Sequence, residues 1–154
     1  VGGTPHGGLA TLNATTGALD AYMGVDVAGH HNWDGSPGTA RGSVGVENFD
    51  LSPDGSRLVA IGNFTSADGL ARDQAMVVRM NAGSAAVDPD WRTAIYEYPC
   101  FSSRFDHYMR DVEFAPDGSY FTVATSGGSN PGTWCDTVVS RGQACNRSTM
   151  KPIT

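Results

Sequence analysis

The fold of this chain is decided by one stretch, which reads Phe49-Asp50-Leu51-Ser52-Pro53-Asp54-Gly55-Ser56-Arg57-Leu58-Val59-Ala60. Apolar residues stand on both sides of a Ser-Pro-Asp-Gly turn, which is the pattern of a β-hairpin. Proline presets φ for the first turn position, aspartate accepts bonds from nearby N–H groups, and glycine takes a positive φ without Cβ strain. The stretch therefore predicts two antiparallel strands joined by a tight turn.

Further strands extend this hairpin into a sheet, which we expect over about residues 45–98. A polar loop over 63–74 leads to a third strand at 76–80, and a second tight turn follows it. A fourth strand is expected from Val87 to Trp91 and beyond. Four short strands joined in this way form one antiparallel four-stranded sheet, and no long amphipathic helix pattern interrupts them.

Other parts of the chain copy this pattern. Residues 112–119 read Val-Glu-Phe-Ala-Pro-Asp-Gly-Ser and match residues 49–56 in their apolar and acidic positions, with Pro116 placed 63 residues after Pro53. Because a single four-stranded sheet cannot bury both of its faces, repeats of this size gain stability by stacking on their neighbours. The sequence thus predicts a stack of similar β-sheets.

The repeats divide the chain into three parts. We expect the end of one repeat over 8–23, a complete repeat over 45–98 and an incomplete repeat over 108–154. Residues 8–23 match the third and fourth strands of the complete repeat, with Leu12 aligned on Met80. Long loops without any periodicity separate the three parts.

The hairpin at 49–60, together with Gly62-Asn63-Phe64-Thr65 and Val78-Arg79-Met80-Asn81, resembles the bacterial delta-60 repeat. Proteins of that family are β-propellers and are often secreted. The resemblance implies an all-β fold, namely a partial β-propeller made of antiparallel four-stranded blades. Since a propeller needs about four blades or more, we expect a fragment of a longer chain, with the remaining blades of that chain as its partners. The long loops and the wide repeat spacing depart from the family's pattern.

The charge of the chain argues against some classes of partner. Its 154 residues include 16 acidic and 10 basic ones, for a net charge of -6, and no basic stripe is present. A nucleic-acid partner is therefore not expected. No run approaches the ~18 apolar residues of a membrane span, so no membrane-spanning segment is expected. The sequence contains no cofactor motif, and no cofactor is expected.

The direction of the strands places all long loops at one end of the sheets. These loops carry the candidate binding residues, which are His31, Trp33, Asp34, Arg104, His107 and Trp134. Because function often lies on loops that a rigid scaffold presents, we expect a glycan or a protein ligand at this end. Trp33 can stack on a sugar ring while its polar neighbours bond the hydroxyl groups. Alternatively, Trp33 and Trp134 cover the edges of sheets.

No residue is assigned to catalysis or to a metal ion. Asp106-His107 is not accompanied by a nucleophile motif such as G-x-S-x-G. His30-His31 and Asp34 lack a third ligand at a suitable spacing for zinc. We therefore favour a non-catalytic scaffold of an exported bacterial protein that presents its loop end for glycan or protein binding.

The alternative is a propeller enzyme of the glycoside hydrolase or lyase type. Asp50 and Glu113 occupy the same place in the first strand of two repeats, and both are flanked by apolar residues. In a closed propeller, alternate positions of this strand approach the central axis. Two carboxyl groups ~5–10 Å apart in a water-filled cleft would favour this alternative.

The three cysteines are Cys100, Cys135 and Cys145, and they lack the paired C-x-x-C spacing of a zinc site. We predict a disulfide between Cys100 and Cys135, because both lie in loops at the same end of the sheets. The competing pair is Cys135 with Cys145. A disulfide indicates an oxidising compartment, so we expect a secreted or cell-surface protein.

Overall fold

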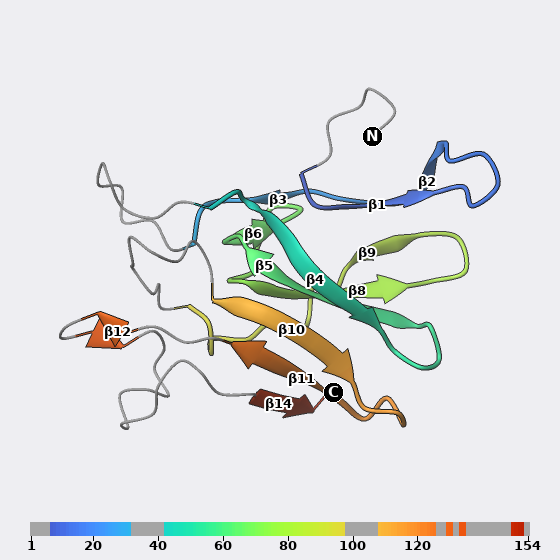
Figure 1. Ribbon diagram of the computed structural model, residues 1–154. Coiled ribbons are helices and arrows are strands. Elements are labelled where there is room, and N and C mark those ends of the chain that lie inside the picture. Colours follow the sequence, from blue (N-terminus) through green and yellow to red (C-terminus); the bar gives the residue numbers. More distant parts are fainter. Residues whose placement is uncertain are drawn as a thin grey trace.

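A computed structural model describes most of the chain, and all of its regular elements are β-strands (Figure 1). It describes residues 7–31, 42–97 and 108–125 with their side chains, and the backbone alone at 129–130, 133–134 and 149–152. The expected all-β class is confirmed for these residues, which contain no helix. No membrane-crossing helix is found in them either.

A four-stranded antiparallel sheet occupies the middle of the molecule. Its strands follow one another in space as they do in sequence: β4 (Gly45–Leu51), β5 (Arg57–Asn63), β8 (Ala75–Met80) and β9 (Ala85–Val87). The expected continuation of the fourth strand to Trp91 is wrong. The carboxylate of Asp88 accepts the N–H groups of Asp90 and Trp91, at 2.9 and 3.3 Å, and this turns the chain away from the sheet.

A smaller sheet lies on each side of the middle one. The first consists of β1 (Leu9–Leu12) and β2 (Leu19–Val25). The third has the order β10-β11-β14, with β10 (Met109–Phe114), β11 (Tyr120–Thr125) and β14 (Thr149–Pro152). β12 (Ser129–Asn130) pairs with β13 (Thr133–Trp134). The strand expected at 137–139 lies outside the described residues.

The hairpin turns of the second and third sheets have the same hydrogen bonds. The N–H of Gly55 donates to the carbonyl of Ser52, and the N–H of Gly118 donates to the carbonyl of Ala115, both at 2.8 Å. The two glycines have φ values of 70° and 72°, in the left-handed region where a Cβ atom is strained. The Ser/Ala-Pro-Asp-Gly sequence therefore forms the same turn twice.

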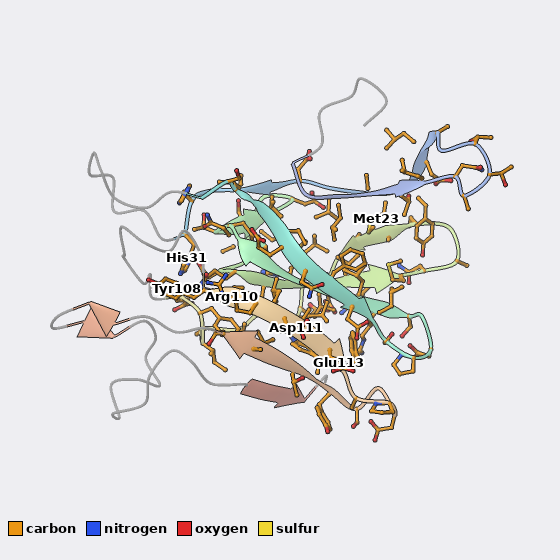
Figure 2. All side chains as sticks on the ribbon, viewed as in Figure 1. Met23, His31, Tyr108, Arg110, Asp111 and Glu113 are labelled. Carbon is orange, nitrogen blue, oxygen red and sulfur yellow. The ribbon has the colours of Figure 1, made fainter. Side chains whose placement is uncertain are left out.

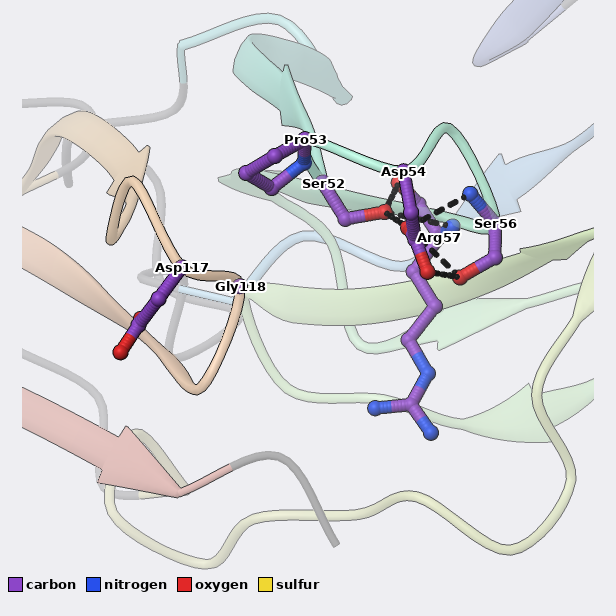
Figure 3. Close-up of a pocket in the computed structure, with 7 residues that line it drawn as sticks. All are labelled: Ser52, Pro53, Asp54, Ser56, Arg57, Asp117 and Gly118. Carbon is purple, nitrogen blue, oxygen red and sulfur yellow. Dashed lines mark hydrogen bonds between the residues drawn. The ribbon is translucent and has the colours of Figure 1, made fainter.

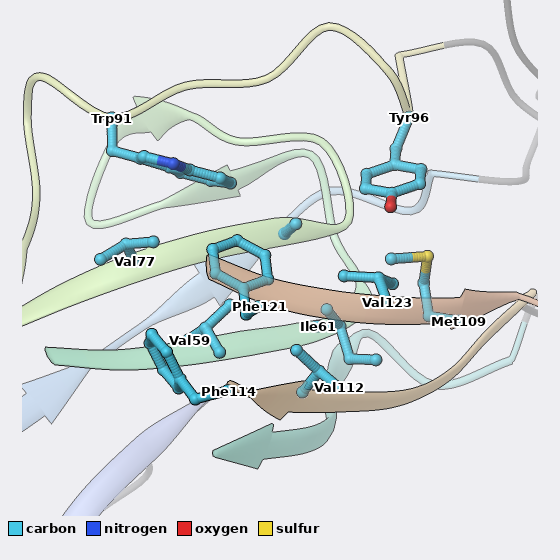
Figure 4. Close-up of a cluster of buried hydrophobic side chains, with 11 residues drawn as sticks. Val59, Ile61, Val77, Trp91, Tyr96, Met109, Val112, Phe114, Phe121 and Val123 are labelled. Carbon is cyan, nitrogen blue, oxygen red and sulfur yellow. The ribbon is translucent and has the colours of Figure 1, made fainter. Parts of the chain in front are cut away.

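The strands β5 and β8 of the middle sheet are buried on both faces, because their alternate side chains contact different neighbouring sheets. One face joins a core with the third sheet through Val59, Ile61, Ala75 and Val77 (Figure 4). The opposite face joins a core with the first sheet through Leu58, Ala60, Met76 and Val78.

Aromatic side chains from the third sheet fill the first of these cores. The rings of Phe114 and Phe121 meet edge to face with centroids 5.6 Å apart, and Trp91 lies 5.9 Å from Phe121. Burying a side chain of this size stabilises a fold by about 1.5–3 kcal/mol. The three sheets thus stack face to face, as the repeat pattern predicts.

One end of the strands carries a further small sheet, in the order β3-β6-β7. Its strands are β3 (Val27–Ala28), β6 (Ser66–Ala67) and β7 (Leu70–Ala71). The segment 63–74, expected to be a plain loop, is therefore a short hairpin. Asp68 and Gly69 form its turn with φ values of 47° and 77°, and Asp-Gly is a preferred pair for such two-residue turns.

Candidate functional site

The candidate site is the loop end of the sheets, where segments from two repeats are joined. The N–H of Thr65 donates to the carbonyl of Ala28, and the N–H of Asp68 donates to the carbonyl of Asp26, both at 2.9 Å. The carboxylate of Asp68 in turn accepts the N–H of Asp26 at 2.9 Å. The described parts of two long loops thus lie at the same end, and backbone hydrogen bonds fix them to each other.

Figure 2 shows the position of His31 among the other side chains, and this residue is buried. Its side chain is 2% exposed, and its Nδ1 atom lies 3.5 Å from Oδ1 of Asp73. Its backbone N–H donates to Oδ1 of Asn63 at 3.0 Å. These contacts hold His31 against the end of β5 in the middle sheet.

Asn63 connects three segments at this position. It is fully buried, and its Nδ2 atom donates to the carbonyls of Gly42 and Ser43, each at 3.3 Å. Its Oδ1 atom accepts the bond from His31. Because a buried amide without partners is costly, Asn63 is stabilised by these bonds, and it holds His31 and the pair Gly42-Ser43 at the end of β5.

Charged groups surround Asp73 at the same end. Burial raises the pKa of Asp73, and repulsion from Glu97 raises it further, while Arg92 opposes both effects. Arg92 is held by a 2.7 Å ion pair with Glu97. Next in sequence, Gln74 has a φ of 61° and donates through Nε2 to the carbonyl of Tyr96 at 3.3 Å. Asp73, Gln74, Arg92 and Glu97 thus form a group of polar side chains at the loop end.

Of the candidate binding residues, His31 is the one whose side chain the structure describes, so its proximity to the others stays a prediction. Trp33, Asp34, Arg104 and His107 lie outside the described residues. Trp134 belongs to β13, where its backbone pairs with Ser129. The predicted disulfide partners Cys100 and Cys135 also lie outside the described part of the chain, as does Cys145, so their pairing stays a prediction.

A second group of polar residues joins β4 and β10, which are the first strands of the second and third sheets. The side-chain amide of Asn48 donates to the carboxylate of Asp111 at 2.7 Å. The carboxylate of Asp50 accepts the N–H of Phe114 at 2.7 Å. Glu113, at the position equivalent to Asp50, is exposed on the opposite face of the third sheet. Asp50 thus bonds the second sheet to the third. Glu113 lies on the face of the third sheet that points away from the second sheet.

Asn48 and Asp111 were not predicted from the sequence, although they stand 63 residues apart, which is the spacing of Pro53 and Pro116 in the two repeats. Both residues follow a bulge, which interrupts β4 between Val46 and Asn48 and β10 between Met109 and Asp111. In each strand the side-chain oxygen accepts the next N–H, at 2.8 and 3.0 Å. Aligning the two copies over a few more residues would have paired these positions.

The opposite end of the strands carries a pocket of about 290 Å³ between the two hairpin turns (Figure 3). Asp54 lines it, and hydrogen bonds from Ser52 and Ser56 lower the pKa of this carboxyl to about 2. Asp117 contributes from the other turn, where Ser119 lowers its pKa in the same way. These carboxylates stabilise their own turns.

Within residues 7–31, 42–97 and 108–125, no group of three or more His, Cys, Asp or Glu side chains is placed to hold a metal ion. No family model, curated protein or solved structure shows a significant match to the chain.

Proposed function

We propose that this chain is part of a non-catalytic β-propeller of the delta-60 repeat type, in an exported bacterial protein, and that its loop end binds a glycan or a protein. The observation that carries the proposal is the joining of two long loops through β3 and β6. Loops fixed in this way form a preorganised surface, which lowers the entropy lost on binding.

The stacking of the sheets supports the propeller. The second and third sheets pack face to face, and their inner strands are linked at equivalent positions by Asn48 and Asp111. The first sheet packs on the opposite face of the second. Continuing this arrangement with further four-stranded sheets leads to a closed propeller, which leaves no exposed sheet faces between blades.

The candidate residues of the loop end have the chemistry for such a ligand. The indole rings of Trp33 and Trp134 offer flat apolar surfaces with a polar N–H group, a combination that is common where proteins bind ligands. Asp34, Arg104 and His107 can bond hydroxyl, carboxylate or amide groups around the aromatic contact. His31, two residues before Trp33 in the sequence, is held by its buried contacts with Asp73 and Asn63.

A glycan array with the purified chain tests this proposal, and a parallel assay for released sugar tests the enzyme alternative. Binding that is lost in Trp33→Ala and kept in Phe49→Ala supports the loop end as the site. Phe49 is the matched control, because it is an exposed aromatic residue on β4. Release of sugar that depends on Asp50 or Glu113 would instead indicate the glycoside hydrolase or lyase.

Export is tested through the cysteines. A Cys100–Cys135 disulfide would stabilise the loop end by roughly 3–4 kcal/mol through loop closure. Peptide mapping without reductant, after expression in an oxidising compartment, should recover the two cysteines in one cross-linked peptide. A Cys135–Cys145 peptide, or three free thiols, contradicts the predicted pairing.

A further inference from the structure

We propose that a further repeat docks its inner hairpin into the space bounded by Phe49 and Leu51 of β4 and by the edge of β1 that no described strand pairs with. The occupant is a two-stranded antiparallel segment of the same type as residues 45–63. This inference rests on the propeller proposed above, and it names the surface at which that propeller continues and the chemistry of the segment that fits there.

The first observation is that two apolar side chains of β4, Phe49 and Leu51, are exposed to solvent. Phe49 pairs with Ala60 and Leu51 pairs with Leu58, so all four lie on the face of the middle sheet that meets the first sheet. Leu58 and Ala60 are buried there, whereas Phe49 and Leu51 are 51% and 46% exposed. The first sheet therefore covers the outer half of this face and leaves its inner half open.

The second observation comes from the equivalent positions one repeat later. Val112 and Phe114 occupy the places of Phe49 and Leu51, but they are only 5% and 6% exposed. They are covered because they share a core with Val59 and Ile61 of β5. The same two positions are thus buried where a β5-like strand is present in the neighbouring sheet, and exposed where it is not.

The third observation is the edge of β1. The matching strand of the middle sheet, β8, pairs with β5 on one side and with β9 on the other. Among the described residues, β1 pairs with β2 alone. The missing neighbour of β1 is therefore the counterpart of β5, which is also the strand that would cover Phe49 and Leu51. One hairpin fills both positions.

This geometry specifies the occupant. Its second strand adds to β1 in antiparallel orientation, by the main-chain hydrogen bonds of strand addition. That strand presents apolar side chains at the positions of Val59 and Ile61, where they contact Phe49 and Leu51. Its first strand lies further in, as β4 does beside β5. The turn between the two strands lies at the same end as residues 52–56.

The test uses the full chain with a second copy of residues 45–63 joined to its N-terminus by a flexible linker. A short linker raises the effective concentration of the added hairpin into the millimolar range, which offsets the weak stability of an isolated hairpin. The matched control carries Val59→Asp and Ile61→Asp in the added copy only. Hydrogen exchange of the β1 amides is measured in both fusions and in the unmodified chain.

We expect the β1 amides to exchange roughly tenfold more slowly, or slower still, in the first fusion and not in the control. Leu51→Asp in the body of the first fusion should remove this protection. Equal protection in both fusions, or in neither, overturns the proposal. Protection of β1 in the unmodified chain that grows with protein concentration also overturns it, because a second copy would then be the occupant.

The result is separable from the proposed ligand binding. Leu51 directly precedes the turn at 52–56, at the end of β4 opposite the loop end. Glycan binding to the loop end is therefore compared between the first fusion and its Leu51→Asp variant as an independent readout. Absence of β1 protection in the first fusion, with ligand binding retained, rejects the docking surface alone. Protection without any ligand rejects the proposed binding function and keeps the docking surface.

Discussion

The side-chain amide of Asn48 donates a 2.7 Å hydrogen bond to Asp111, the residue that stands 63 positions later in the chain and at the same point of the next repeat. Each of the two residues follows a bulge, and each accepts the N–H of its own successor. The side chain at this position of the repeat therefore makes two hydrogen bonds, one within its own strand and one to the neighbouring sheet.

We predict that Asn48 and Asp111 are energetically coupled. Replacing each by alanine, singly and together, should show a coupling of about 0.5–1 kcal/mol in urea unfolding, because the bond is exposed and its net contribution is modest. Asn48→Ala combined with Asp117→Ala is the control pair, since Asp117 lies in the hairpin turn and bonds Ser119. A control pair as strongly coupled as the test pair would contradict the prediction.

We predict that Asp50 stabilises the contact between the second and third sheets. Asp50→Ala leaves the N–H of Phe114 without its acceptor and should lower the free energy of unfolding by about 1–3 kcal/mol, whereas Asp50→Asn keeps an acceptor and should cost less. Glu113→Gln is the matched control at the equivalent position, where a change within about 0.5 kcal/mol is expected for an exposed side chain. A larger effect at Glu113 than at Asp50 would sink the prediction.

We predict a low pKa for Asp54, set by its serine neighbours. Its carboxylate accepts the hydroxyl groups of Ser52 and Ser56, at 2.7 and 2.8 Å, and its pKa is lowered to about 2. The stabilisation is therefore complete above the ordinary value of 3.8 and is lost as the pH falls towards 2. NMR titration should give this low value in the native chain.

Ser52→Ala tests the cause of this low pKa. It leaves Asp54 with the partners that Asp117 has in the other hairpin, where Ala115 replaces the serine. The pKa of Asp54 should rise in this variant, and that of Asp117 should not change. An unchanged Asp54 titration in Ser52→Ala would show that the hydroxyl is not its cause.

We predict that Gly55→Ala weakens the fold through backbone strain alone. A Cβ atom added at Gly55 meets nothing within 4 Å, but the φ of 70° costs an L-residue about 1–2 kcal/mol. Gly83→Ala, in the turn between β8 and β9, is the control. Its site is equally open, and its φ is not in the left-handed region. Thermal unfolding should separate the two variants; similar stabilities would count against the strain argument.

The hairpins and their stacking could be predicted because local chemistry specifies them. The Ser-Pro-Asp-Gly turn sets its own backbone angles, and alternation on either side of it assigns each side chain to a face. The expected fourth strand extended too far, to Trp91, whereas β9 ends at Val87. Asp88 turns the chain there through hydrogen bonds that a strand pattern does not reveal. The Asp68-Gly69 turn was readable in the sequence, but its flanking strands of two residues are too short to show a period.

The candidate site could be predicted less well. The common end of the long loops followed from strand direction, and the pairing of β3 with β6 agrees with it. The depth of His31 could not be predicted, because a histidine in a polar loop gives no sign of burial. Its position depends on Asn63 and Asp73, which lie 32 and 42 residues later in the chain and meet it only through tertiary packing.

The alternation of side chains along β5 gives each of its residues a different neighbour. Val59 and Ile61 contact the third sheet, while Leu58 and Ala60 contact the first. A slip of one residue in the pairing of β5 would exchange these two sets and send each side chain into the wrong core. The strand is therefore held in register from both sides at once, and a one-residue insertion or deletion between Leu58 and Ile61 should unfold the whole stack, not a single sheet.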